Sequence, residues 1–193
     1  MHGLINRSFQ CFLRETYGER LWTAVAESSG LPPEGFEAMM KYDDGLTYAV
    51  LAAASNALAK PRDALLEDMG SFLVSIEPLR RLLRFGGVDY VDFLYSLDEL
   101  PDRVRLALPD LDLPDLTLAA ISETRFELTI HTEQPGYVPA FVGILRAMAD
   151  DYGALALIDT GENVWITDKI GIELLQNRFA SGRSFDLTHP EVA

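Results

Sequence analysis

Few residues of this 193-residue sequence are of the types that perform catalysis or bind metals. The candidates are three histidines and one cysteine: His2, His131, His189 and Cys11. They are scattered along the chain without the spacing of a metal site or a catalytic triad. The sequence also lacks a P-loop, a G-x-G-x-x-G string after a strand, and the G-x-S-x-G, H-E-x-x-H and C-x-x-C motifs.

Paired acidic residues are the other candidates for chemistry. The pairs Asp43-Asp44, Asp98-Glu99 and Asp150-Asp151 fall in expected loops or on helix surfaces. At such places a carboxylate caps a helix or faces solvent more often than it forms an acid–base dyad. We therefore expect that the chain is not an enzyme.

The charge and composition of the chain restrict its partners. The net charge is −14, from 30 acidic and 16 basic residues, and 48% of the residues are hydrophobic. So acidic a surface repels nucleic acids and anionic membranes, or simply keeps the protein soluble. A single cysteine excludes an internal disulfide, and no signal peptide or membrane-spanning run is evident. These features favour a cytoplasmic protein of bacterial style.

A proline lies in the middle of residues 88–108, a segment that follows a series of expected helices. Residues 88–108 carry apolar side chains at helical spacing, which predicts one long amphipathic helix with a buried face. Pro101 lies inside this run, where it removes a backbone hydrogen bond at a cost of about 3 kcal/mol. We expect the helix to bend or restart near residues 98–101. The preceding helices are predicted over residues 4–15, 19–27, 47–59, 60–76 and 77–84.

The last part of the chain predicts strands around one helix. Strands are expected over 116–122, 125–130, 154–160 and 164–174, with a hairpin turn at residues 161–163 and a helix over 138–152. Helices followed by this series predict an α+β fold with one antiparallel sheet. We expect a single domain over residues 1–185, made of a helical subdomain (1–60) and a helix-plus-sheet subdomain (61–185), with a tail over 186–193.

Several local strings resemble the heme nitric-oxide/oxygen-binding (H-NOX) family of bacterial gas sensors and guanylate cyclase regulatory domains. They include Met1-x-Gly3-Leu4-Ile5, Tyr17-Gly18-Glu19-x-x-Trp22, Tyr48, Ala53-Ala54-Ser55, Lys60-Pro61, Phe93-Leu94, Leu97-Asp98-x-Leu100, Val104, Pro109, Pro114, Gly136, Pro139 and Gly143. The resemblance implies an H-NOX-like fold: an N-terminal helical subdomain, then long helices and a small antiparallel sheet with one inserted helix.

The same resemblance places two family motifs on residues that have lost their chemistry. The family's iron-binding histidine falls at Pro101. The family's Y-x-S-x-R motif, which holds the heme propionates, falls at Ile130, Thr132 and Gln134. Only Thr132 keeps a hydroxyl, and Gln134 lacks the charge that makes arginine a strong carboxylate partner. We therefore expect that conventional histidine-ligated heme binding has been lost and that no metal is bound.

No other residue is an obvious substitute for the missing iron ligand. His131 alternates with Ile130 and Thr132 along the expected strand and should face the opposite side. His189 lies in the tail, and Cys11 is expected to be a small core or surface residue. His2, near the start of the chain, is the best single substitute that the sequence offers.

The resemblance also predicts the wall of a heme-equivalent pocket. Its residues are Ile5, Leu73, Leu97, Pro101, Pro114, Ile130, Thr132, Gln134, Tyr137, Ala140 and Ile144. This lining suits an apolar ligand, as proposed for the 4-vinyl-reductase-type domains of similar fold, or else it closes into a packed core. The sequence leaves both outcomes open.

Three functions remain. The first is an H-NOX-like sensory or regulatory domain without conventional heme, acting through a partner such as a histidine kinase or a diguanylate cyclase. The second is a heme-binding gas sensor with an atypical or missing protein ligand. The third is a protein that binds another apolar molecule in the same pocket.

Overall fold

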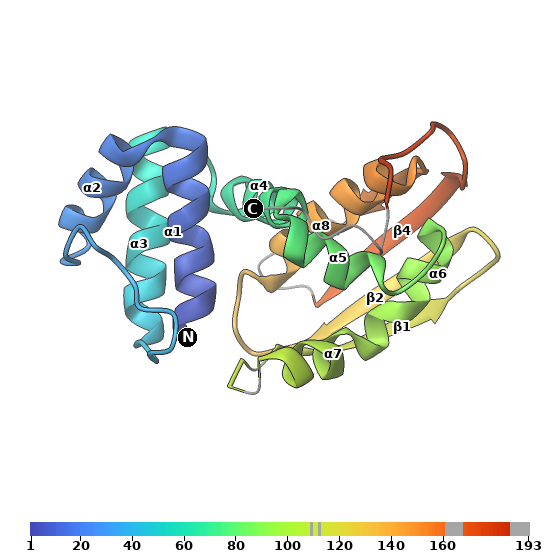
Figure 1. The fold of residues 1–193 in the computed structure, drawn as a ribbon, viewed down its shortest axis with the longest axis horizontal. Helices are drawn as coiled ribbons and strands as arrows, with labels where there is room; N and C mark the ends of the chain where they lie inside the picture. Colours follow the sequence, from blue (N-terminus) through green and yellow to red (C-terminus); the bar gives the residue numbers. More distant parts are fainter. Residues whose placement is uncertain (109, 112, 161–167, 186–193) are drawn as a thin grey trace.

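The computed structural model describes residues 1–108, 110–111, 113–160 and 168–185. A group of three helices lies at one end of the molecule, and α4 leads from it to the part that contains the sheet (Figure 1). The helices are α1 (Gly3–Tyr17), α2 (Glu19–Ser28), α3 (Asp44–Leu58), α4 (Arg62–Ser75), α5 (Glu77–Arg84), α6 (Tyr90–Tyr95), the 3₁₀ helix η1 (Ser96–Glu99), α7 (Leu100–Ala107) and α8 (Tyr137–Tyr152). Within the described residues, no helix combines the length and apolar character needed to cross a membrane.

Side chains of the first three helices and α4 form one hydrophobic cluster. Phe12, Leu13 and Trp22 are almost completely buried in it, and Leu65 of α4 joins them. The start of α3 is fixed by Asp43, whose carboxylate accepts a hydrogen bond from the backbone N–H of Gly45 at 2.8 Å. This cap stabilises the helix where the sequence predicted a loop leading into it.

The segment predicted as one helix over 88–108 is divided into α6, η1 and α7. The expectation of one long helix is therefore wrong, whereas the expected restart near residues 98–101 is what the structure shows. Pro101 lies in the first turn of α7, where its missing N–H has no helical partner to lose. The interruption thus avoids the cost that proline has in the interior of a helix.

The four strands form one antiparallel sheet in the order β1-β2-β4-β3. They are β1 (Asp115–Ala120), β2 (Arg125–His131), β3 (Leu155–Asp159) and β4 (Lys169–Gln176). Phe126, Leu128 and Ile130 alternate along β2 and are buried in a second hydrophobic cluster, together with α8 side chains. Among the described residues the last strand runs from Lys169; residues 161–167, which include the expected hairpin turn and the expected start of this strand at 164, lie outside the described residues.

Helices α4 and α8 cross closely enough to join the two clusters. A Cβ atom on Gly70 would lie 2.0 Å from the carbonyl oxygen of Ala140, and one on Gly143 would lie 1.9 Å from that of Glu67. Only glycine permits so close an approach of two backbones. Because α8 also covers the sheet, this crossing ties the helical group to the sheet-containing part.

Candidate functional site

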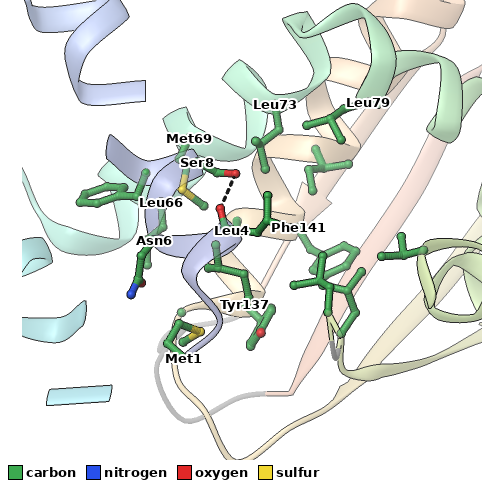
Figure 2. Close-up of a pocket in the computed structure, with 18 of the residues that line it drawn as sticks. Met1, Leu4, Asn6, Ser8, Leu66, Met69, Leu73, Leu79, Tyr137 and Phe141 are labelled. Atoms are coloured by element: carbon green, nitrogen blue, oxygen red, sulfur yellow. Dashed lines mark hydrogen bonds between the residues drawn. The ribbon is translucent and has the colours of Figure 1, made fainter. Parts of the chain in front are cut away.

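An apolar cavity of about 260 Å³ lies between the helical group and the sheet-containing part. Leu4, Leu73, Leu79 and Phe141 come together there from α1, α4, α5 and α8 (Figure 2). The cavity exceeds the engineered apolar cavity of roughly 150 Å³ that binds benzene. A packed core, the second outcome that the sequence left open, is therefore not what the structure shows.

The described residues of this cavity wall include no charged side chain and no histidine. The wall consists of Met1, Leu4, Ile5, Asn6, Ser8, Phe9, Thr47, Tyr48, Leu51, Leu66, Met69, Leu73, Leu79, Leu82, Leu83, Leu100, Val104, Leu108, Leu111, Leu113, Pro135, Gly136, Tyr137, Ala140, Phe141 and Ile144. Five residues from the predicted pocket are among them: Ile5, Leu73, Tyr137, Ala140 and Ile144.

A second, polar cavity of about 370 Å³ adjoins the first and shares residues such as Ile5 and Tyr137 with it. Three further residues of the predicted pocket, Pro114, Thr132 and Gln134, line this polar cavity and not the apolar one. The predicted pocket is therefore divided between two neighbouring spaces of opposite character.

The structure places Leu97, Pro101 and Ile130 in neither cavity wall. Leu97 and Ile130 are completely buried in the second hydrophobic cluster, and Pro101 is buried at the start of α7. On this helix Leu100 and Val104, four residues apart, contact the apolar cavity instead. The position that the resemblance gives to an iron ligand is thus occupied by a buried ring without a donor atom.

The three residues aligned with the Y-x-S-x-R motif do not share one strand face. The strand β2 ends at His131, and the chain then turns, with the backbone N–H of Gln134 donating to Thr132 Oγ1 at 3.0 Å. The side-chain amide of Gln134 donates to Asp44 at 3.0 Å. The expectation of a common face is wrong because the strand alternation stops before Thr132.

The histidines that the structure describes have other contacts. His131 is exposed, and its Nε2 lies 2.9 Å from the hydroxyl of Thr117 on β1. It lines the polar cavity together with Thr132, so the expectation that these two residues face opposite sides is wrong. His2 caps α1, because its Nδ1 accepts from the backbone N–H of Leu4 at 3.1 Å, and it lines only the polar cavity. Cys11 is half-buried on α1 outside both cavity walls, and His189 lies outside the described residues.

The donor set of the apolar cavity does not fit a histidine-ligated heme. The available heteroatoms belong to amide, hydroxyl, phenol and thioether groups such as those of Asn6, Tyr48 and Met69. Burial, and to a lesser degree the charge of Asp44, raises the pKa of Tyr48, which disfavours the phenolate form that binds iron in catalase. No group of three or more histidine, cysteine, aspartate or glutamate residues suited to a metal occurs in the described part of the chain.

Sequence reasoning missed the contribution of α5 to the cavity. Leu79, Leu82 and Leu83 of this helix line the wall. Their spacing of three and four residues gives α5 one apolar face, which is the pattern that could have revealed them. Sequence reasoning also missed Met69 and Val104 as cavity residues. Helical periodicity indicates that their side chains are buried, but not whether they line a cavity or pack in the core.

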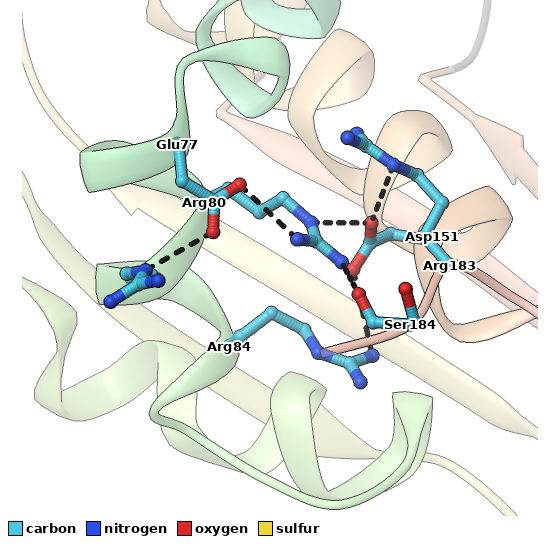
Figure 3. Close-up of polar contacts among 7 residues, drawn as sticks. Glu77, Arg80, Arg84, Asp151, Arg183 and Ser184 are labelled. Carbon is cyan, nitrogen blue, oxygen red and sulfur yellow. Dashed lines mark hydrogen bonds and ion pairs between the residues drawn. The ribbon is translucent and has the colours of Figure 1, made fainter. Parts of the chain in front are cut away.

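A buried ion cluster lies outside both cavities and has a structural role (Figure 3). Arg80 Nε on α5 and Asp151 Oδ1 on α8 are 2.7 Å apart, and both side chains are at least 95% buried. Arg80 also donates to the backbone oxygen of Ser184 at 2.9 Å, while Arg84 and Arg183 approach Asp151 at 3.5 and 3.8 Å. The cluster therefore fixes the segment after β4 to α5 and α8.

Comparison with known proteins agrees with this architecture. The Haem-NO-binding (HNOB) family matches residues 2–158, and the chain belongs to this family. Among solved structures, an I5F mutant of T. tengcongensis H-NOX superposes with a TM-score of 0.75 and 18% identity, over 92% of this chain and 99% of that one. An oxygen-binding H-NOX domain related to soluble guanylate cyclases gives a TM-score of 0.72, 18% identity, and coverage of 95% and 100%.

The related sequences are segments of longer proteins. Soluble guanylate cyclase gcy-31 of Caenorhabditis elegans is 27% identical over 155 residues, which are 78% of this chain and 22% of that protein. Soluble guanylate cyclase 89Db of Drosophila melanogaster is 22% identical over 158 residues, 80% of this chain and 24% of that protein. The chain thus spans less than a quarter of the length of these relatives.

Proposed function

We propose that this chain is a cytoplasmic sensory domain of H-NOX type that binds a small apolar molecule where other family members hold a histidine-ligated heme. The observation that carries the proposal is the apolar cavity, whose wall includes five residues of the predicted heme-equivalent pocket and, among its described residues, no imidazole. Burial of apolar ligand surface in such a space is favourable without any charged or metal contact.

The helices around the cavity suggest how occupancy becomes a signal. Helix α7 begins at Leu100, one residue before Pro101, and presents Leu100 and Val104 to the cavity. Helices α5 and α8 also contribute residues to the cavity wall, and the Arg80–Asp151 pair joins them outside it. A ligand that binds one arrangement of these helices better than another shifts the population toward it. No covalent bond to iron is required for this coupling.

We propose that the signal passes to a partner protein, such as a histidine kinase or a diguanylate cyclase. The relatives are named as guanylate cyclases, and this chain matches less than a quarter of their length. In this proposal the catalytic step belongs to another domain or another chain, and this domain supplies the regulation.

A heme bound without histidine is the second candidate, favoured by the family match and by the thioether of Met69 in the cavity wall. The visible absorption spectrum of the purified protein distinguishes this candidate from the first proposal, an apolar ligand without heme. We expect protein from heme-supplemented cells to show no stoichiometric Soret band, because the cavity wall offers no strong iron ligand. Denaturing mass spectrometry of the same sample should then reveal any small apolar molecule that co-purifies.

The matched variants for this experiment are Pro101→His and Pro101→Ala. Both remove the proline, whose ring does not reach the cavity, but only histidine places a longer side chain with an imidazole at the family's ligand position. We expect greater heme uptake by Pro101→His than by Pro101→Ala. A stoichiometric Soret band in the unmodified protein that shifts with nitric oxide contradicts the first proposal and supports the second candidate.

A further inference from the structure

One polar group in the wall of the apolar cavity lacks a hydrogen-bond partner. Asn6 on α1 is 1% exposed and lines the cavity. Its Oδ1 accepts a hydrogen bond from the hydroxyl of Thr47 on α3 at 2.9 Å. Its Nδ2, which carries two donor hydrogens, has no acceptor among the described residues.

This arrangement is costly for the protein by itself. Asparagine is a poor helix former in an interior position, and a buried donor that makes no hydrogen bond loses the solvation it has in the unfolded chain. A water molecule beside Nδ2 would need two to four polar partners, whereas most residues of the cavity wall, such as Phe9, Leu51 and Leu66, are apolar. A ligand acceptor atom would satisfy the donor without these additional partners.

The charge of the cavity restricts the ligand further. None of the described wall side chains carries a charge, and the N-terminal ammonium of Met1 is already paired with Asp44, so an ionised ligand would be desolvated without a free counterion. Another polar group of the wall, the hydroxyl of Ser8, already has a partner: it donates to the backbone oxygen of Leu4 at 2.9 Å (Figure 2). The wall thus favours an uncharged molecule with little polar surface.

We infer that the ligand class of this cavity is a neutral, mainly apolar carbonyl compound whose oxygen accepts a hydrogen bond from Asn6 Nδ2. This inference rests on the proposed function, because it specifies the molecule that the cavity binds. Asn6 acts as the specificity-determining residue, since a hydrocarbon of the same shape leaves its donor unpaired. Thr47 orients the amide by holding Oδ1.

Acetophenone and ethylbenzene test the inference, because they have nearly the same shape and differ in the carbonyl oxygen. Isothermal titration calorimetry gives the Kd of each for the unmodified chain, for Asn6→Leu and for the control Ser28→Ala, which removes a hydroxyl on α2 outside the cavity wall. We expect acetophenone to bind more tightly than ethylbenzene to the unmodified chain. The ratio of the two Kd values should fall by about tenfold in Asn6→Leu, the effect of one net hydrogen bond, and stay unchanged in Ser28→Ala.

Each outcome has a distinct meaning. If both compounds bind and the ratio is the same in Asn6→Leu, the role of Asn6 is wrong while the proposed apolar site stands. If neither compound binds the unmodified chain, the proposed function itself fails. If Asn6→Leu does not fold, the side-chain amide resonance of Asn6 in the unmodified chain decides: acetophenone must shift it strongly and ethylbenzene must not.

Discussion

Tyr152, the last residue of α8, shows how burial changes the chemistry of a single side chain. Its hydroxyl donates to the backbone oxygen of Gly87 at 2.9 Å, and the Arg84 guanidinium lies 3.9 Å from its ring centroid. Burial raises the pKa of Tyr152 to about 12, with the cation of Arg84 opposing and nearby carboxylates such as Asp151 adding to the shift. The folded protein therefore holds this proton more tightly than the unfolded chain does.

The raised pKa gives a prediction for alkaline solution. Between pH 10 and 12 the unfolded chain loses the Tyr152 proton while the folded protein keeps it, so this contribution to stability is complete below pH 10 and declines above it. Tyr152→Phe removes the titrating group. We expect the free energy of unfolding, measured in urea, to fall less between pH 10 and 12 in this variant. Parallel curves for the two proteins would contradict the prediction.

Between elements, the position of the cavity wall depends on the close crossing of α4 and α8. Gly70 and Gly143 let the two backbones meet, and Ala140 and Ile144 on the same stretch of α8 line the cavity. Ser71 adds a hydrogen bond to the carbonyl oxygen of Gly143 at 3.2 Å. The position of one cavity wall is therefore set by a contact that has no room for a side chain.

Gly143→Ala tests this dependence. Its Cβ would lie 1.9 Å from the carbonyl oxygen of Glu67, so the helices must separate, and we expect a loss of about 1–3 kcal/mol in the free energy of unfolding. Gly171→Ala in β4 is the matched control, since its Cβ would come no closer than 3.5 Å to the carbonyl oxygen of Asp159. Equal effects of the two substitutions in urea unfolding would show that the crossing tolerates a methyl group.

Across the whole molecule, one buried ion cluster connects segments that are far apart in the sequence. Burial alone lowers the pKa of Arg80, but the hydrogen bond and the charge of Asp151 raise it on balance. Arg80 and Arg84 also lie 5.5 and 4.9 Å from the ring centroid of Phe185, beyond the end of β4. The cluster thus holds α5, α8 and the segment around residues 179–185 in one arrangement.

Asp151→Ala measures how much this arrangement depends on the buried carboxylate. Removing it leaves the buried Arg80 guanidinium without its closest partner, and we expect a loss of about 3–5 kcal/mol in the free energy of unfolding. Arg183→Ala is the control, because its side chain is 57% exposed and 3.8 Å from Asp151, so we expect a loss below about 1 kcal/mol. Chemical denaturation of both variants checks the difference.

Local sequence patterns were sufficient to predict most helices and strands, but not which elements pack against one another. The apolar spacing of residues 138–152 predicted α8 almost to its bounds, because a single buried face determines that helix. The same reasoning predicted one helix where the structure has α6, η1 and α7, because the apolar spacing continues through the interruption at Pro101. It also extended the β2 alternation to Gln134, whereas the chain turns after His131.

By itself, the sequence determined the α+β class, the family resemblance and the absence of a histidine at position 101, because these depend on residue identity and local spacing. Only the tertiary structure decided that the space stays open, that Leu100 and Val104 reach it while Pro101 does not, and that Asn6 keeps an unpaired donor in its wall. The physical reason is that cavities and unpaired groups are properties of packing. They arise where side chains from distant helices fail to fill or satisfy one another, and no single segment encodes that outcome.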